Sequence, residues 1–382
     1  MANAIVPARV LHLRSSAGLY GAEHMILNLM PRLTDLGITT ELGCLQNQHL
    51  DEQAFHDEAV ARGLTSHLIE CAGKLDLNTA QAIKRCASHR DINLMHVHDY
   101  KSAFYAWLAR RKISAPLVVT SHGQFADSSA VGLYNRIEIA LMRRADIVCI
   151  VAESMRSLLV SSGIAPDRIR LIPNGIDIDR FTPGDASDVR TELGIAPGEL
   201  VFGTAMRLTE VKNPLGLVEA FAVRVARNPA PARLVVAGDG PLREAVHSRV
   251  EQLGLGSQVL LLGARTDLER LYRCFDAFVL PSRSEGLPLA LLEAMACGVQ
   301  VVASAVGEIP TVLDGLPASL VPPGDARSLS EALCSVTVNQ QIGQQMRDRI
   351  VERYSSPSMA QRYADIYRLL LEENPAHMMH AH

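Results

Sequence analysis

Short runs of apolar residues alternate along the chain with longer stretches in which apolar positions recur at helical spacing. Continuous apolar runs are typical of parallel strands that are buried on both faces. Because helical stretches separate these runs, we predict a series of βαβ units and an α/β fold. The strands predicted for a first sheet are residues 10–13, 94–97, 117–120 and 147–151. The strands predicted for a second sheet are residues 200–205, 234–237, 259–262, 277–280 and 300–303.

The length of the chain and one irregular segment predict two domains. A chain of 382 residues is long enough for two hydrophobic cores. The segment 172–185 contains Pro and Gly and has no helical period, so we take it as the boundary. The expected divisions are a domain over residues 1–178, a domain over 179–355, and a final helix with a frayed tail over 356–382. The clearest helices are predicted at residues 22–36, 215–227 and 358–373.

Composition narrows the class of protein. Hydrophobic residues make up 48% of the chain and charged residues 20%, which is ordinary for a globular protein. The net charge of −4 gives no electrostatic support for a nucleic-acid partner. No apolar run approaches the ~18 residues of a membrane span, and seven scattered cysteines without a CxxC pair fit a reducing cytosol. Basic clusters at 110–112 and 143–144 are read as solvated helix ends, with contact to the inner face of a membrane as the alternative.

Two glutamates flank a predicted helix start in the segment PSRSEGLPLALLEAMACG. Glu285 lies in the loop after the strand 277–280, and Glu293 lies in the helix that follows. Pro288 suits the first position of that helix, and Gly298 suits the position after its end. A helix N-terminus favours a phosphate, so the segment suits a ligand with hydroxyls at both ends and phosphate between them. The alternative is an amphipathic helix with two solvated glutamates.

Two cations follow another predicted strand, in the segment FGTAMRLTEVKNP. Arg207 and Lys212 lie just before Asn213, which can cap a helix, and Pro214, which suits its first position. A guanidinium fork, a point charge and free amide groups together are the chemistry of a diphosphate site. The alternative is an exposed loop with two solvated cations.

Other motifs fit either a site or a plain structural role. Gly18 and Gly21 allow a tight turn after the first strand, and Gly238 lies in a turn at the end of the strand 234–237. His96 and His98 point the same way on a strand, as zinc ligands would, but no further ligand accompanies them at familiar spacing. We therefore expect one buried histidine and one that lines the cleft, and we expect no bound metal. The pair Asp177 and Asp179 is read as a structural turn and not as a metal site.

The motif EGLPLALLE, with the Arg207 and Lys212 pair, resembles the signature of retaining glycosyltransferases of family 4, which have the GT-B fold. The resemblance covers nearly the whole chain; it is strong over residues 200–325 and loose over 40–90. It implies two Rossmann-like domains that face each other across a cleft, with the final helix crossing back onto the first domain. Ala205 and Glu308 stand where the family has glycine, which leaves the donor sugar open.

The resemblance also implies a role for each candidate residue. Arg207 and Lys212 would stabilise the departing diphosphate, Glu285 would hold hydroxyls of the donor sugar, and Glu293 would bind the ribose. His122 matches the histidine that faces the donor sugar near the reacting carbon. Acceptor contacts are assigned to His98 and Tyr20. The remaining donor contacts are assigned to Gly18, Gly21, Gly238, Gly286, Leu287 and Pro288.

The expected protein is therefore a cytoplasmic hexosyltransferase that moves a sugar from a nucleotide diphosphate-sugar to a glycan or lipid-linked acceptor. UDP is the first choice for the nucleotide and GDP the second, and bacterial surface-polysaccharide synthesis is the expected setting. Two alternatives stay open: a sugar-nucleotide epimerase of similar fold, which would need acid and base groups beside the sugar ring, and a catalytically silent subunit that binds nucleotide. Domains joined in this way are expected to close around their ligand.

Overall fold

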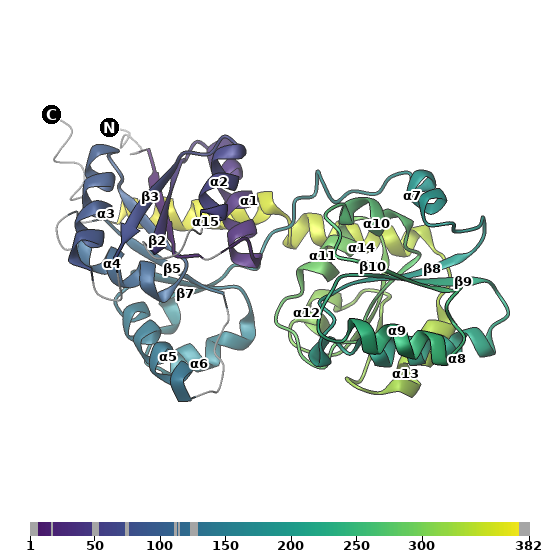
Figure 1. Ribbon diagram of the computed structural model, residues 1–382. Helices are drawn as coiled ribbons and strands as arrows, with labels where there is room; N and C mark the ends of the chain where they lie inside the picture. Colours follow the sequence, from purple (N-terminus) through teal and green to yellow (C-terminus); the bar gives the residue numbers. More distant parts are fainter. Residues whose placement is uncertain are drawn as a thin grey trace. The chain divides into compact units, whose positions relative to one another are not determined.

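The structure is a computed structural model (Figure 1) that describes residues 7–16, 18–47, 53–72, 76–110, 113, 115–122 and 129–373. The side chains of residue 47 and of 129–135 are not among those described. The chain forms two compact units. Unit 1 comprises Met1–Gly175 and Ser356–His382, and unit 2 comprises Ile176–Ser355.

Unit 1 contains a seven-stranded parallel sheet in the order β3-β2-β1-β4-β5-β6-β7. Every residue of its central strand β4 is buried, as expected for a strand with helices on both faces. The strands are β1 (Arg9–Arg14), β2 (Thr39–Asn47), β3 (Ser66–Cys71), β4 (Leu94–Val97), β5 (Leu117–Ser121), β6 (Ile147–Ile150) and β7 (Ile169–Leu171).

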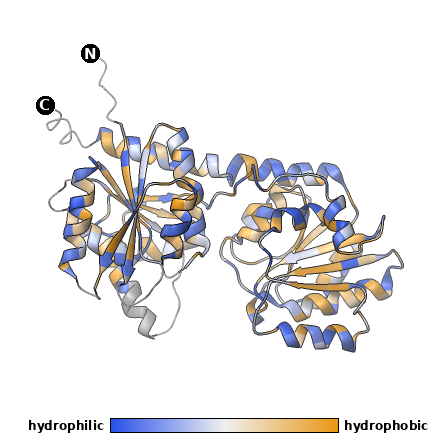
Figure 2. Cartoon of the chain, turned by 45° about the horizontal axis from the view of Figure 1, so that its top comes forward, coloured by the Kyte–Doolittle hydropathy of each residue, from blue (hydrophilic) through white to orange (hydrophobic). Residues whose placement is uncertain are grey.

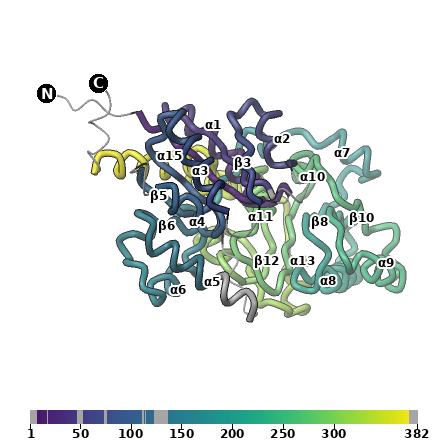
Figure 3. The backbone as a smooth tube through the Cα atoms, turned by 60° about the vertical axis from the view of Figure 1, so that its left-hand side comes forward, coloured from purple at the N-terminus to yellow at the C-terminus, as the bar shows by residue number. Residues whose placement is uncertain are grey.

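Helices cover both faces of this sheet and form a core on each. One core joins α1, α2 and α15 to the sheet, and the other joins α3, α4 and α6 to it. In α15, Met359, Tyr363 and Tyr367 recur at helical spacing and pack in the same core as α1, beside which α15 lies in Figures 1 and 3. The helices are α1 (Gly21–Asp35), α2 (Ala54–Ala61), α3 (Leu77–His89), α4 (Tyr100–Arg110), α5 (Ser129–Met142), α6 (Arg156–Ser161) and α15 (Ser356–Glu372), with short 3₁₀ turns η1 (Glu153–Met155) and η2 (Pro166–Arg168).

Unit 2 contains a six-stranded parallel sheet in the order β10-β9-β8-β11-β12-β13. Helices α8, α9 and α13 cover one face, while α7, α10, α11 and α14 pack in the core on the other (Figure 1). Its strands are β8 (Leu200–Ala205), β9 (Ala232–Ala237), β10 (Val259–Gly263), β11 (Ala277–Leu280), β12 (Gln300–Ser304) and β13 (Ser319–Val321). Its helices are α7 (Ser187–Glu192), η3 (Glu210–Lys212), α8 (Pro214–Arg227), α9 (Arg243–Gln252), α10 (Leu268–Cys274), α11 (Leu289–Ala296), α12 (Ile309–Leu313), α13 (Ala326–Ser335) and α14 (Gln340–Arg353).

The prediction of an α/β fold with two parallel sheets is confirmed, and Figure 2 shows hydrophobic strands inside both units. Each of the nine predicted strands has a counterpart in the structure. Four strands were missed: β2, β3, β7 and β13. The edge strands β7 and β13 have three residues each, which is too short to give a hydrophobic pattern. Among the helices of the described chain, none has both the length and the hydrophobicity of a membrane span.

Candidate functional site

The predicted donor residues of unit 2 follow β8 and β11, which are neighbours in the sheet. The carboxyl ends of parallel strands lie at one edge, which is where ligands bind in sheets of this type. Two hydrogen bonds join the loops that leave these strands. The amide of Arg283 donates to the carbonyl of Val211 over 2.7 Å, and the Asn213 side chain donates to the carbonyl of Pro281 over 3.4 Å.

This junction joins Lys212 to Glu285. Lys212 Nζ donates to Oε1 and Oε2 of Glu285, at 2.6 Å each, and Ser282 Oγ donates to Oε1, also at 2.6 Å. The Glu285 side chain is 6% exposed and the Lys212 side chain 28%. A carboxylate this deeply buried needs such partners, because an unpaired buried charge is costly. Sequence reasoning assigned the two residues to different parts of a ligand, and the structure pairs them directly.

Two helix starts near this pair differ from their predictions. Pro288 has an extended backbone (φ −75°, ψ 112°) and precedes α11, so its assignment to the first helical position was wrong by one residue. Asn213 precedes α8 as predicted, but its backbone is left-handed (φ 55°) and its side chain does not cap the helix. The Asn213 side chain instead donates through its nitrogen to the carbonyl of Pro281 in the loop after β11. Gly298 follows α11 with φ 78°, as predicted.

Arg207 follows β8 and is exposed, and its guanidinium has no hydrogen-bond or ion-pair partner within the described residues. The backbone beside it is fixed on both sides, because the amides of Met206 and Leu208 donate to the carbonyls of Ala237 and Asp239. At Gly238 (φ 131°) a Cβ atom would lie 1.9 Å from the carbonyl oxygen of Met206. The glycine of this turn is therefore needed for a close backbone approach, and that approach holds Arg207 at the sheet edge.

A second glycine supports the loop that carries Glu285. A Cβ atom at Gly307 (φ 56°) would lie 2.2 Å from the carbonyl oxygen of Glu285, and the amide of Glu308 donates to the carbonyl of Gly286 over 3.0 Å. Leu287 is partly buried against the core beneath α11. The loop after β12 therefore packs against the loop after β11 and limits its movement.

Glu293 lies in α11, with its Oε2 accepting a hydrogen bond of 2.9 Å from the hydroxyl of the fully buried Tyr272. Burial raises the pKa of Glu293 above its usual value, while the bond from Tyr272 acts in the opposite direction. The structure thus fixes the orientation of the carboxylate that we assigned to the ribose. It does not bring Glu293 into contact with the Lys212–Glu285 pair by any hydrogen bond among the described residues.

In unit 1 the predicted glycine-rich loop leads into α1, which begins at Gly21. Glu23 is fully buried and forms a 2.8 Å ion pair with Arg14 Nε, and its Oε2 accepts a hydrogen bond from the amide of Tyr20. Burial raises the pKa of Glu23, but hydrogen bonds from Ser16 and Arg14 and the charge of Arg14 bring it below its usual value. The Tyr20 residue is 64% exposed, and the loop at Gly18 is held by the hydroxyl of Ser16.

Arg14 and Asp99 tie this loop to the end of β4. Arg14 also donates to the backbone carbonyl of His98 over 2.6 Å, and Asp99 Oδ2 accepts from the amide of Ser15 over 2.8 Å. Asp99 Oδ1 accepts from the first amides of α4, those of Lys101 and Ser102. Sequence reasoning assigned no role to either residue, although Arg14 directly follows the predicted strand 10–13 and Asp99 lies two residues after the strand 94–97.

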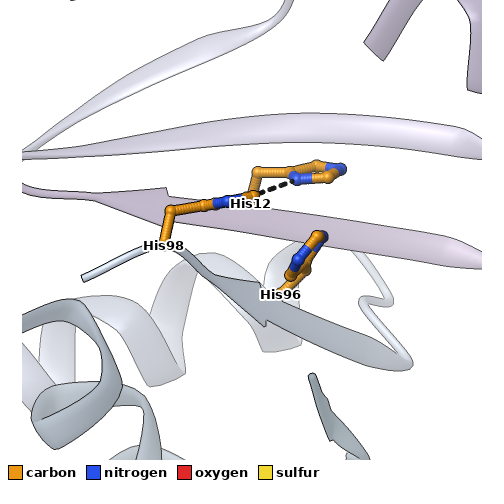
Figure 4. Close-up of side chains that lie close together, drawn as sticks. All are labelled: His12, His96 and His98. Carbon is orange, nitrogen blue, oxygen red and sulfur yellow. Dashed lines mark hydrogen bonds between the residues drawn. The ribbon is translucent and has the colours of Figure 1, made fainter. Parts of the chain in front are cut away.

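Four histidines gather on one face of the same sheet. His12 on β1 lies beside His96 on β4 in the strand register, and His98 and His122 follow β4 and β5. His12 Nδ1 lies 3.1 Å from His98 Nε2, as Figure 4 shows, and His98 Nδ1 lies 3.4 Å from His122 Nε2. Both nitrogens of His96 bond to hydroxyls instead, Nδ1 to Tyr367 and Nε2 to Thr120, at 2.7 Å each.

Burial keeps these rings neutral. It lowers the pKa of His12 and of His122 to about 3, with the charge of Arg14 adding to the effect at His122. It also lowers the pKa of His96 and His98 well below the usual range, and the neighbouring histidines add to this. His96 and His98 are both buried (relative exposure 0% and 2%), so the expectation that one of the two is exposed to a cleft has no support within unit 1.

The trio His12, His96 and His98 is also the grouping that a metal ion would use. One nitrogen from each lies within 4.8 Å of the others (Figure 4). Their nitrogens already have hydrogen-bond partners, with His12 Nε2 the exception among the described atoms of the trio. A bound ion would have to break several of these bonds, so the contacts favour a hydrogen-bonded cluster. The absence of a metal from the reaction stays a prediction.

Other sequence-based candidates have local explanations. Asp177 Oδ1 accepts from the amides of Asp179 and Arg180, within its own turn. A cavity of about 230 Å³ in unit 2 is lined by residues of α8 and α13 and of the loops before α8 and after β11 and β13. Asn213, Pro281 and Arg283 are among its lining residues, but Arg207, Lys212 and Glu285 are not.

The basic clusters also bond within unit 1. Arg110 pairs with Asp146, and Arg143 and Arg144 donate to backbone carbonyls. Residues 111 and 112 lie outside the described part of the chain. Contact with a membrane therefore stays a prediction.

Comparison with protein families gives two matches that together span most of both units. The family described as Glycosyltransferase Family 4 matches residues 20–180. The family described as Glycosyl transferases group 1 matches residues 199–339. The second match contains Arg207, Lys212, Glu285 and Glu293, and the first contains His98 and His122.

Similar sequences come from several bacteria. The putative glycosyltransferase EpsF of Bacillus subtilis is 31% identical over 78% of this chain and 79% of its own length. A D-inositol 3-phosphate glycosyltransferase of Actinosynnema mirum is 32% identical over 70% of both chains. A UDP-Gal:α-D-GlcNAc-diphosphoundecaprenol α-1,3-galactosyltransferase of Escherichia coli is 28% identical over 76% of this chain and 79% of its own.

Among solved structures, Anabaena HepE in complex with UDP superimposes with a TM-score of 0.80. The comparison covers 94% of this chain and 99% of that one, at 21% sequence identity. The two proteins therefore share a fold.

Proposed function

This chain belongs to the family 4 glycosyltransferases of GT-B fold, and from that premise we propose that it transfers a sugar from a nucleotide diphosphate-sugar to an acceptor hydroxyl. The acceptor is a glycan or a lipid-linked saccharide, and the reaction retains the anomeric configuration and needs no metal ion. Unit 2 binds the donor, and unit 1 binds the acceptor.

The observation that carries the proposal is the ion pair of Lys212 and Glu285 at the sheet edge that also bears Arg207. The Lys212 ammonium group has three N–H donors, and the two oxygens of Glu285 accept from it. The donor that remains can bond to a phosphate. Arg207, which is exposed and has no partner among the described residues, supplies a planar fork for a second phosphate contact. Glu285 accepts hydrogen bonds from hydroxyls of the donor sugar, and Glu293 accepts them from the ribose. The loop of Gly286, Leu287 and Pro288 leads into the first amides of α11, which can donate to a phosphate.

In the proposed reaction the bond between the sugar C1 and the diphosphate oxygen breaks, and a bond from C1 to the acceptor oxygen forms on the same face. The acceptor hydroxyl gives its proton to the departing diphosphate. Arg207 and Lys212 stabilise the negative charge that grows on this leaving group, which lowers the barrier because the charge is largest in the transition state. His122 contacts the donor sugar near C1.

The names of similar proteins support a choice of donor and acceptor. The HepE structure contains UDP, and the name of the Escherichia coli relative specifies UDP-Gal and a diphosphoundecaprenol-linked acceptor. We therefore propose a UDP-hexose as the donor, with a GDP-sugar as the second choice. For the acceptor we propose a saccharide on a lipid diphosphate, which the exposed Tyr20 contacts. His98 is buried and bonds through both ring nitrogens, so we no longer assign it to the acceptor. Such an acceptor requires work at the inner face of a membrane during surface-polysaccharide synthesis.

A transfer assay tests the proposal. Purified protein is given UDP-, GDP- and ADP-sugars with lipid-linked saccharide acceptors, and nucleotide release and the anomeric configuration of the product are measured. We expect UDP release only when acceptor is present, and a loss of at least about a hundredfold in Arg207→Ala. The matched control is Arg227→Ala, which removes an exposed arginine from the far end of α8. A changed sugar without any acceptor would instead favour an epimerase, and nucleotide binding without turnover would favour a silent subunit.

A further inference from the structure

Three histidines form a chain of hydrogen bonds: His12 on β1, and His98 and His122, which directly follow β4 and β5. His12 Nδ1 contacts His98 Nε2 at 3.1 Å, and His98 Nδ1 contacts His122 Nε2 at 3.4 Å. The two outer nitrogens of the chain, His12 Nε2 and His122 Nδ1, are buried without a partner among the described residues. His96 lies beside the chain but bonds to Tyr367 and Thr120, so it is not one of its links.

Counting protons leaves two possible directions for this chain of hydrogen bonds. A neutral imidazole has one N–H and one lone pair, and a hydrogen bond between two rings needs one of each. His98 bonds through both nitrogens, so it donates to one neighbour and accepts from the other. Either His12 donates to His98 and His98 donates to His122, or both bonds run in the opposite sense. In the first case His122 carries its proton on Nδ1, and in the second case His12 carries its proton on Nε2.

The surroundings of the two ends favour the first case. His12 is fully buried in the sheet core, and an N–H there would be a permanently unpaired donor. Unpaired buried N–H groups are rarer in proteins than unpaired acceptors, because their loss of solvation is not compensated. His122 Nδ1 is buried as well, but His122 directly follows β5, at the edge where ligands bind in sheets of this type, and the residue as a whole is partly exposed, so a ligand can supply the missing partner.

We infer that His12 and His98 are positioning residues that hold His122 as its Nδ1–H tautomer, so that His122 donates a hydrogen bond and cannot accept a proton at that atom. Together with the proposed function, this makes His122 a donor to a hydroxyl oxygen of the transferred sugar, and it excludes His122 Nδ1 as a general base. The chain of hydrogen bonds thereby makes the proposed role of His122 more specific. The tautomer itself does not depend on which group the protein transfers.

The wild-type protein gives the direct test. Long-range ¹H–¹⁵N spectra of protein labelled with ¹⁵N-histidine distinguish the Nδ1–H tautomer from the Nε2–H tautomer. The His122 signals are assigned by their loss in His122→Gln. We expect a neutral His122 with its proton on Nδ1. A proton on Nε2 of His122 would overturn the inference, and because no substrate is present, the result is independent of the proposed activity.

A matched pair of variants tests whether His12 acts through His98. Asn at position 12 offers an N–H to His98 Nε2, whereas Asp offers acceptors and forces His98 to donate to it. We expect His12→Asp to reverse the chain and move the His122 proton to Nε2, and to lower kcat about tenfold while the affinity for UDP stays unchanged. His12→Asn should keep the Nδ1–H tautomer and a kcat within about threefold of wild type.

An unchanged His122 tautomer in His12→Asp, or equal losses of kcat in the two variants, would contradict a positioning role for His12. If no donor supports transfer in any variant, the proposed function fails, whereas the tautomer measurements still decide the inference. If Asp at position 12 prevents folding, the wild-type spectrum alone decides which end of the chain carries the proton.

Discussion

The ammonium group of Lys212 lies 2.6 Å from each carboxylate oxygen of Glu285, across 73 residues of sequence. The pair is formed by two loops that leave neighbouring strands and bond to each other through their backbones. Each residue is therefore expected to contribute to the stability of unit 2, and each is also a candidate for donor binding. Substitutions that separate these two contributions test the site most clearly.

Lys212→Met should destabilise unit 2, because the Glu285 carboxylate is 6% exposed and would keep only Ser282 of its described partners. We expect a loss of about 2 kcal/mol in the free energy of unfolding, and about 1 kcal/mol for Glu285→Gln. The double variant, Lys212→Met with Glu285→Gln, should be more stable than Lys212→Met alone, because it has no unpaired carboxylate charge at position 285. All three should lose transfer activity. Urea unfolding and the transfer assay measure both effects, and additive losses in the double variant would show that the pair is not coupled.

Gly307→Ala should disturb the loop that carries Glu285, because its Cβ would lie 2.2 Å from the Glu285 carbonyl oxygen. Gly315 is a matched control, since it also has a left-handed backbone (φ 70°) but open space around its Cβ position. Both alanine variants should lose about 1 kcal/mol of stability from backbone strain. Only Gly307→Ala should weaken UDP binding measured by calorimetry, and equal UDP affinities for the two would argue against this support of the loop.

Tyr272→Phe should shift the pH range over which nucleotide binds. Burial already raises the pKa of Glu293, and the Tyr272 hydroxyl opposes this by donating to the carboxylate. Without the hydroxyl the pKa rises further, so Glu293 becomes protonated at a higher pH and accepts fewer hydrogen bonds from ribose. As the pH is lowered, the affinity for UDP should therefore start to decrease at a higher pH in Tyr272→Phe than in wild type. Tyr363→Phe, in unit 1, is the control, and identical pH profiles for wild type and Tyr272→Phe would contradict the ribose role.

Glu138 in α5 should make the stability of unit 1 depend on pH. Burial and the charge of Asp99 raise its pKa to about 7, and Arg14 opposes the rise. The pKa of Glu138 in the folded protein lies above the ordinary value of 4.5, so the folded state binds this proton more tightly than the unfolded state does. The stability that this proton contributes is complete below pH 4.5 and is lost as the pH rises to about 7. Glu138→Gln should therefore gain about 2 kcal/mol over wild type at pH 8 and nothing at pH 4.

Urea unfolding at the two pH values checks the Glu138 prediction, with the exposed Glu244→Gln as control. A Gln variant whose advantage over wild type is the same at both pH values would show that Glu138 titrates normally.

Much of the fold could be predicted because strands buried on both faces leave continuous apolar runs. The missed strands β2 and β3 lack this signal, since Glu41 on β2 is buried and bonds to His67 on β3 over 2.6 Å. A buried polar residue such as Glu41, paired with a partly exposed residue on the adjacent strand, gives its strand the sequence pattern of a surface segment. This is the region in which the resemblance to the family was loose.

The site could be predicted only in part, for a similar reason. Residues at strand ends were found from local patterns, because the strand and the helix after it are close in sequence. Their partners come from far along the chain: Tyr272 lies 21 residues from Glu293, and His12 lies 86 residues from His98. Hydropathy patterns contain no information on such pairs, which depend on strand order and register.

Titration of UDP into the purified protein tests the central claim most directly, namely that unit 2 holds a nucleotide diphosphate through Arg207 and the Lys212–Glu285 pair. Calorimetry on wild type, Arg207→Ala and the control Arg227→Ala gives three affinities under one condition. We expect wild type and Arg227→Ala to bind UDP, and we expect Arg207→Ala to lose at least about tenfold in affinity. Equal affinities for wild type and Arg207→Ala, or no binding of UDP, GDP or ADP by wild type, would contradict it.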